Sequence, residues 1–186
     1  TYTPIPTLIP ATSTHTPVPD TPTPTNTPDT YTGLTIEDLI NRTYGGGLVE
    51  IVETMEERET FTRYLIRYPS DGLMIYGFMN VPIEGDNFPV AFVLHGYLPE
   101  AEYEVKAYTT RYADALAEAG YFVFHPNYRN HPPSDSGNYN AFRVDYAVDV
   151  LNLIAIIKEQ GQDPAGTLRR TDPDNIHIMG HSMGGG

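Results

Sequence analysis

The chain has 186 residues, which is enough for one domain with a sizeable hydrophobic core and too few for two well-built ones. Its 24 acidic and 11 basic residues give a net charge of −13 without any basic run, which argues against nucleic-acid binding and against anionic membrane surfaces. The absence of cysteine excludes disulfides, thiolate metal sites and a cysteine nucleophile, and no apolar run approaches the roughly 18 residues of a membrane span.

The N-terminal segment differs in composition from the rest of the chain. Residues 1–30 hold 8 of the 17 prolines and 11 threonines, with only two charged side chains. Because proline removes an amide donor and nothing here repeats an apolar face, neither a helix nor a strand is expected. We therefore expect residues 1–33 to be a disordered Thr/Pro-rich linker.

Such Thr/Pro stalks commonly tether extracytoplasmic domains to an anchor. On this basis we expect an extracytoplasmic protein, secreted or at the cell surface, in which the linker at 1–33 serves as a tether to the cell envelope. The alternative is a disordered tail without a specific role.

Globular patterning begins after the linker. Thr35 and Asp38 fit a capping box at the start of a short helix, which ends before the glycines at 45–47. The sequence therefore predicts a helical and irregular lead-in over 34–60 and the folded domain over 61–186.

The domain opens with strand patterns. Alternating residues over 61–68, a Pro-Ser-Asp-Gly turn at 69–72 and a second strand pattern over 73–81 predict an antiparallel hairpin. Residues 89–94 form an unbroken apolar run, which is typical of a strand buried on both faces.

Strands then alternate with helices. Apolar residues at helical spacing predict helices within 102–119 and 141–160, and short apolar runs predict strands at 121–124 and 176–179. This alternation predicts an α/β fold with a doubly wound, mostly parallel sheet that carries the N-terminal antiparallel hairpin at its edge.

Gly180, Ser182 and Gly184 fit the pattern G-x-S-x-G of a nucleophile elbow. In such an elbow the serine occupies a strained turn between strand and helix, and the close backbone approach requires glycine on either side. The motif follows an apolar strand without a gap, so its context favours a catalytic role over a plain glycine-rich turn. Ser182 is the candidate nucleophile, and the backbone N–H of Met183 is a candidate donor to the developing oxyanion.

A second motif, His95-Gly96-Tyr97, follows directly on the buried strand at 89–94. In such folds the loop after this strand supplies the other oxyanion N–H. Gly96 lets the backbone come close, and the backbone amide of Tyr97 is the candidate donor. We expect His95 to be a structural histidine that bonds loop carbonyls rather than a catalytic group.

The segment from about residue 64 to 186 resembles the N-terminal two-thirds of an α/β-hydrolase, similar to prolyl-oligopeptidase-type serine peptidases and dienelactone-hydrolase-like esterases. The residues that carry the resemblance are His95–Tyr97, Asn127–His131, Asp172–Ile176 and Gly180–Gly185. The resemblance implies an α/β-hydrolase fold that is incomplete at the C-terminus, with Ser182 as the nucleophile and Tyr97 and Met183 as the oxyanion hole. Additional candidate pocket residues are His95, Tyr128 and Arg129.

The catalytic triad of this fold follows the chain order Ser, then Asp or Glu, then His. Only four residues follow Ser182, none of them acidic or histidine, and all six histidines precede it. We therefore expect a truncated sequence whose triad acid and base lie beyond residue 186, and we expect the 186-residue chain itself to be inactive.

The sequence thus predicts a serine hydrolase that cleaves a small ester or a peptide substrate through an acyl-enzyme on Ser182, without a cofactor or a metal ion. Asp145 and Asp149, four residues apart on a predicted helix, are expected to be solvated carboxylates because no further metal ligands accompany them. The alternative is a catalytically inactive hydrolase-fold binding module on a surface stalk. The intact elbow favours the enzyme, since a binding module does not need a strained turn.

Overall fold

The computed structural model describes residues 32–137 and 143–186. The linker predicted at 1–33 therefore lies, up to residue 31, outside the described residues, and so does the start of the helix predicted at 141–160. No helix in the described part of the chain is long and apolar enough to cross a membrane.

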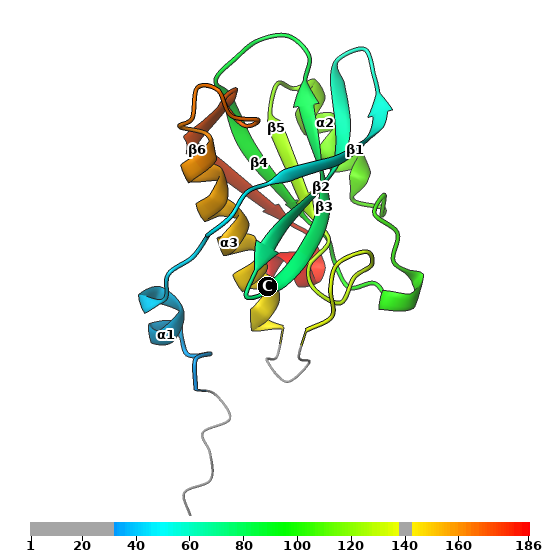
Figure 1. Ribbon diagram of the computed structural model, residues 1–186. Helices are drawn as coiled ribbons and strands as arrows, with labels where there is room; N and C mark the ends of the chain where they lie inside the picture. Colours follow the sequence, from blue (N-terminus) through cyan, green and yellow to red (C-terminus); the bar gives the residue numbers. More distant parts are fainter. Residues whose placement is uncertain (1–31, 138–142) are drawn as a thin grey trace, which may run out of the picture. The chain divides into compact units, whose positions relative to one another are not determined.

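Six strands form a single sheet in the order β1-β2-β3-β5-β4-β6 (Figure 1). The strands are β1 (Glu50–Glu57), β2 (Phe61–Ser70), β3 (Leu73–Pro82), β4 (Phe88–Leu94), β5 (Phe122–Pro126) and β6 (Thr171–Gly180). The helical elements are α1 (Ile36–Asn41), η1 (Glu100–Glu102), α2 (Thr110–Glu118), α3 (Val144–Gln160) and η3 (Ser182–Gly185).

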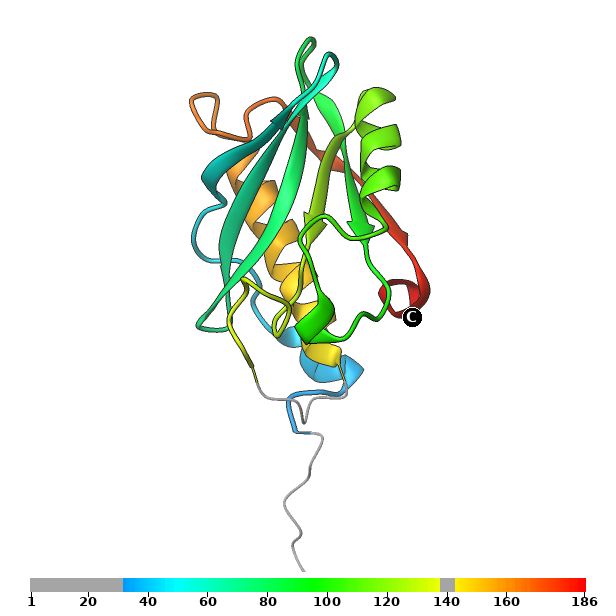
Figure 2. The same cartoon turned by 90° about the vertical axis from the view of Figure 1, so that its right-hand side faces the viewer.

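Helices cover both faces of the sheet, with α2 on one face and α3 on the other (Figure 2). Alternate side chains of β4 enter different cores: Val90 and Phe92 pack toward α3, whereas Ala91 and Val93 pack toward α2. The prediction that 89–94 is a strand buried on both faces is confirmed, and so is the α/β fold class.

The sheet is mixed, with a larger antiparallel part than the sequence predicts. β5, β4 and β6 are parallel, while β1, β2, β3 and β5 pair antiparallel in succession. The predicted hairpin is formed by β2 and β3, but β1 lies outside it, so the hairpin is not at the edge of the sheet.

The lead-in predicted at 34–60 contributes to the sheet. Its first half forms α1 with the expected capping box between Thr35 and Asp38. Its second half forms β1, which pairs with β2, so the folded domain begins before residue 61. No residue of β1 is fully buried. Because neither face of the strand enters the core, its sequence needs no apolar alternation, and without that alternation a strand could not be predicted.

Three boundaries differ from the sequence pattern. β2 and β3 remain paired up to Ser70 and Leu73, so the turn contains only Asp71 and Gly72, whose φ angles of 51° and 80° match a two-residue hairpin turn. The predicted helix at 102–119 is α-helical only over α2. The turn expected at 172–175 is an irregularity inside β6, where the pairing with β4 shifts register.

A buried ion pair joins the loop after β5 to α3 and to the end of the hairpin. Arg129 Nη2 donates to Asp149 Oδ1 at 2.7 Å, and the Arg129 backbone N–H donates to Asp149 Oδ2 at 2.9 Å. Ser70 Oγ donates to the same carboxylate at 2.6 Å and accepts from Asn152 Nδ2. Asp149 is completely buried, so the expectation that it is a solvated carboxylate is wrong.

We predict that Asp149→Asn lowers the free energy of unfolding by about 3–5 kcal/mol, because it leaves the Arg129 guanidinium buried without its main counter-charge. The matched control is Asp145→Asn, one turn earlier on α3, where the carboxylate is partly exposed and lies 3.4 Å from Arg129 Nη1. The control should cost about 1 kcal/mol or less. Urea denaturation measures both, and equal losses in the two variants would contradict this account of the network.

Candidate active site

Ser182 lies in a tight turn after β6, at the first residue of η3. Its φ angle is 52°, in the left-handed region that residues other than glycine seldom adopt. Such a conformation costs on the order of 1–3 kcal/mol and persists only where the surrounding structure imposes it. The turn has the strained backbone that the elbow motif predicts.

The two motif glycines are required by close backbone contacts. A Cβ atom on Gly180 would overlap the carbonyl oxygen of Gly184, and a Cβ atom on Gly184 would lie 2.5 Å from the carbonyl oxygen of Leu94. Both positions therefore exclude any larger residue. These contacts are the close backbone approach for which glycine is expected on either side of the serine.

The turn is bonded to the end of β4. The backbone N–H of His181 donates to Leu94 O at 3.0 Å, and the N–H of Gly184 donates to His181 O at 3.0 Å. Since β4 and β6 are parallel neighbours, their carboxyl ends meet at one edge of the sheet, which brings the loop after β4 next to Ser182.

The two predicted oxyanion donors lie on these adjoining segments. Within residues 32–137 and 143–186, no acceptor is found for the backbone N–H of Tyr97 or of Met183. The N–H groups of Gly96 and Gly184 are already bonded to Tyr108 Oη and His181 O. Unbonded donors next to a nucleophile are what an oxyanion hole needs.

His95 has the structural role expected from the sequence. It is completely buried, with Nδ1 2.7 Å from Gly96 O and Nε2 2.9 Å from Asn127 O. Burial lowers the pKa of its imidazole, although the two carbonyl partners oppose that shift. His95 therefore fixes the loop between the ends of β4 and β5 and is not available as a pocket residue.

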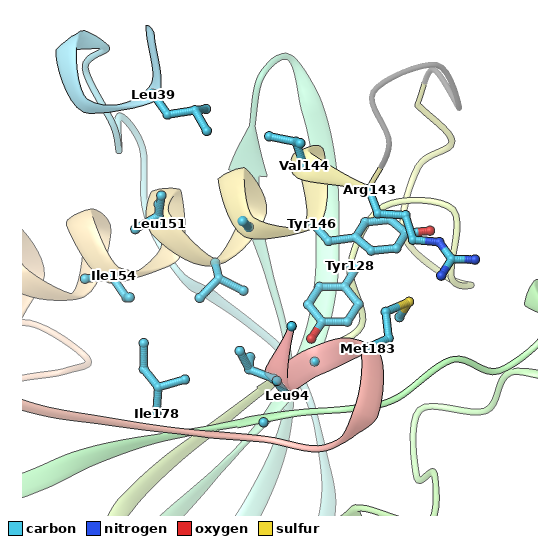
Figure 3. Close-up of a pocket in the computed structure, with 16 residues that line it drawn as sticks. Leu39, Leu94, Tyr128, Arg143, Val144, Tyr146, Leu151, Ile154, Ile178 and Met183 are labelled. Atoms are coloured by element: carbon cyan, nitrogen blue, oxygen red, sulfur yellow. The ribbon is translucent and has the colours of Figure 1, made fainter. Parts of the chain in front are cut away.

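The other two candidate pocket residues have different environments. Arg129 is buried and held by Asp149 inside the domain, and it is not among the residues that line the groove described next. Tyr128 lines an apolar groove of about 810 Å³ between α3 and β6, and its ring stacks on Tyr146 with a centroid distance of 5.0 Å (Figure 3).

The groove adjoins the elbow through Met183 and the glycines that follow it. Ser182 is not one of its lining residues, and among the described residues that line it Arg143 has the only charged side chain. The other labelled side chains of Figure 3 are Leu39, Leu94, Val144, Leu151, Ile154 and Ile178. The lining therefore offers apolar contacts beside the nucleophile rather than groups that could perform acid–base chemistry.

The histidines near the site are bonded to groups other than the nucleophile. His125 Nε2 lies 2.7 Å from Thr109 Oγ1, and His131 Nδ1 lies 3.2 Å from Arg129 O. His181 Nδ1 lies 2.7 Å from the hydroxyl of Tyr108. No hydrogen bond of the Ser182 hydroxyl is found within the described parts of the chain, so none of these histidines is placed as its base.

The sequence suggests Tyr108 only as one of several tyrosines that could edge an acyl pocket, with ordinary packing preferred, whereas the structure places its hydroxyl at the elbow. It contacts Gly96 and His181, which lie 12 residues before it and 73 residues after it. Its position follows from the sheet topology, and no local motif marks it.

A family model described as alpha/beta hydrolase fold matches residues 91–186, just over half of the chain. The structure is similar to acetyl xylan esterase 1 from Thermoanaerobacterium sp. JW/SL YS485, with a TM-score of 0.57 and 19% identity, covering 75% of this chain and 46% of that one. It is also similar to an S-formylglutathione hydrolase from Agrobacterium tumefaciens, with a TM-score of 0.52 and 16% identity, covering 73% of this chain and 54% of that one.

The chain thus spans about half the length of these two solved structures. At such identities the likeness shows a shared fold. A search of curated proteins gave no match to the sequence.

We predict a pH-dependent loss of stability that His125 causes in part. Complete burial lowers the pKa of His125 to about 3, whereas the unfolded chain has the ordinary value of about 6.5. The unfolded state therefore binds the proton more readily, and stability that is full above pH 6.5 declines as the pH falls toward 3.

The measurement is the melting temperature between pH 7.5 and 4 for wild type and His125→Gln, which does not titrate. The variant should lose less of its melting temperature over this range. The control is His177→Gln, which removes an exposed ring and should keep the wild-type slope. A slope for His125→Gln as steep as that of wild type would show that His125 does not contribute.

Proposed function

The chain belongs to the alpha/beta hydrolase fold family, and on this premise we propose that the protein is a serine hydrolase that cleaves an ester bond through an acyl-enzyme on Ser182. The observation that carries the proposal is the left-handed φ of Ser182, together with the N–H groups of Tyr97 and Met183, for which no acceptor is found among the described residues. Glycine at position 182 would relieve this backbone strain, as glycine does at positions 180 and 184 for the close contacts there. A serine in that conformation is explained by the use of its hydroxyl.

In the proposed mechanism Ser182 Oγ attacks the carbonyl carbon of the ester, and the carbonyl oxygen becomes an anion. The N–H groups of Tyr97 and Met183 donate to this oxyanion, and one such donor is typically worth about 10²–10³ in rate. The serine proton passes to a histidine base and then to the departing alcohol, after which water releases the acid by the same route.

The proposal assigns the base to a histidine that follows Ser182, because the acid and histidine of this fold follow the serine in chain order. The environments of the preceding histidines support this assignment. His95 bonds two carbonyls, His125 bonds Thr109, and His181 bonds Tyr108.

Two observations favour an ester over a peptide substrate. The names of the similar solved structures denote an esterase and a hydrolase of S-formylglutathione. The loop after β4 also has Tyr97 and Leu98 where prolyl-oligopeptidase-type peptidases usually show Gly-Pro. We therefore propose that the protein resembles dienelactone-hydrolase-like esterases more than prolyl-oligopeptidase-type peptidases.

We also propose an extracytoplasmic location, with residues 1–33 as a tether to the cell envelope. The support is compositional, since Thr-Pro alternation without an apolar face suits an extended spacer.

For the protein that carries the proposed acid and histidine after Ser182, here called wild type, we predict that Ser182→Ala lowers kcat for p-nitrophenyl acetate at least about 1000-fold, because the nucleophile is lost while the fold is kept. The melting temperature should stay within about 2 °C of wild type, since only one hydroxyl is removed at the surface turn. Ser136→Ala, at an exposed loop position, is the matched control and should keep full activity.

A fluorophosphonate probe should label Ser182 in wild type and fail to label the alanine variant. The p-nitroanilide with the same acyl group distinguishes the bond type, and its kcat/KM should be at least about 100-fold below that of the ester. Retention of a tenth of the activity in Ser182→Ala would exclude the serine as nucleophile.

A further inference from the structure

The hydroxyl of Tyr108 lies between the loop after β4 and the elbow. Gly96 N–H donates to Tyr108 Oη at 3.0 Å, and Oη lies 2.7 Å from His181 Nδ1. Gly96 directly precedes Tyr97, which offers the first oxyanion N–H, and His181 directly precedes Ser182. One hydroxyl group therefore joins the two segments that form the proposed site.

Tyr108 itself is fixed by its neighbour in the chain. Thr109 is completely buried, and its hydroxyl lies 2.7 Å from Nε2 of His125, the penultimate residue of β5. The Tyr108 ring meets the His181 ring edge to face, with centroids 5.2 Å apart. The phenol thus extends from an anchored backbone, although 40% of its surface is exposed.

The loop fits closely against this pair of rings. A Cβ atom on Gly96 would overlap Tyr108 Oη and would lie 3.1 Å from His181 Nδ1. Position 96 therefore needs glycine for a reason that the elbow motif alone does not supply.

The hydrogen bond also selects which amide faces the substrate. Because Tyr108 Oη accepts the N–H of Gly96, that donor is withdrawn from the site, and the N–H of Tyr97 is the next one in the loop. The contact with His181 then sets the distance between this N–H and the N–H of Met183, two residues past His181. Oxyanion donors act only when they are held where the negative charge develops.

We propose that Tyr108 is a positioning residue that keeps the two oxyanion donors in register by bonding Gly96 and His181 at once. The proposal rests on the serine hydrolase function proposed above. Tyr108 acts through the two backbone segments and touches no reacting atom.

The expected effect follows from what is lost. Deleting an oxyanion donor costs about 10²–10³ in kcat. Tyr108→Phe keeps both donor N–H groups and removes only the hydroxyl that fixes the distance between them. We therefore expect about a 10- to 100-fold loss in kcat. KM should stay within about twofold, because these donors bind the transition state more strongly than the ground state.

The experiment compares Tyr108→Phe with Tyr112→Phe, which removes the same atom one turn further on. The Tyr112 hydroxyl is bonded to the exposed Arg111 and contacts neither segment of the site, so this control should keep wild-type kcat. His181→Asn keeps a hydrogen-bonding atom near the place of Nδ1 and should retain most activity, whereas His181→Leu should lose as much as Tyr108→Phe.

The double variant Tyr108→Phe/His181→Leu should be no worse than the poorer single variant, because both changes break one link. A kcat for Tyr108→Phe within twofold of wild type would overturn the proposal. So would additive losses in the double variant, or a loss that appears equally in Tyr112→Phe.

The outcome for Ser182→Ala separates this proposal from the proposed function. If hydrolysis depends on Ser182 but not on Tyr108, only the positioning role fails. If wild type shows no hydrolysis that depends on Ser182, the proposed function fails and the positioning role of Tyr108 in catalysis fails with it.

Amide hydrogen exchange at Gly96 tests the hydrogen bond to Tyr108 directly, without reference to activity. Exchange should be at least about tenfold faster in Tyr108→Phe than in Tyr112→Phe, and equal rates would overturn the proposed link as well.

Discussion

The elbow is built on a close backbone approach between the ends of two parallel strands. Where β4 ends, the Leu94 carbonyl accepts the N–H of His181 and lies against Gly184, so the chain after β6 can turn only because position 184 has no side chain. The same pairing brings the loop that follows β4 beside Ser182. The positions of Ser182 and of the loop that carries Tyr97 depend on this one contact.

Buried polar groups hold the loops that leave these strands. His95 joins its own loop to Asn127 at the end of β5, and the Tyr103 hydroxyl donates to the Asn127 side chain at 2.9 Å. Burial lowers the pKa values of His95 and His125, which keeps both rings neutral near pH 7. Neutral imidazoles in a dry interior can hold loop geometry without adding charge beside a developing oxyanion.

The parts of the site that depend on local backbone sterics could be predicted from the sequence. The glycine spacing around Ser182 and the buried run at 89–94 are each visible within a few residues of chain, although the contact that requires Gly184 is with Leu94, far away in sequence. β1 could not be predicted, because a strand without a buried face has no apolar period. The burial of Asp149 depends on Arg129, 20 residues away in sequence, and so no pattern along the helix distinguishes it from a solvated carboxylate.

Left-handed backbone at residues other than glycine occurs after β5, before α3 at Arg143, and after β6. Asp71 and Asn87, which also have positive φ, are of residue types that tolerate this region in turns. Tyr128, with φ of 67°, and Ser182 are not, and each follows a strand end at the groove or the elbow. A surface that only had to bind a partner could relax both positions with glycine and gain stability. The left-handed conformation of Ser182 therefore supports the proposed hydrolase over the alternative of an inactive binding module.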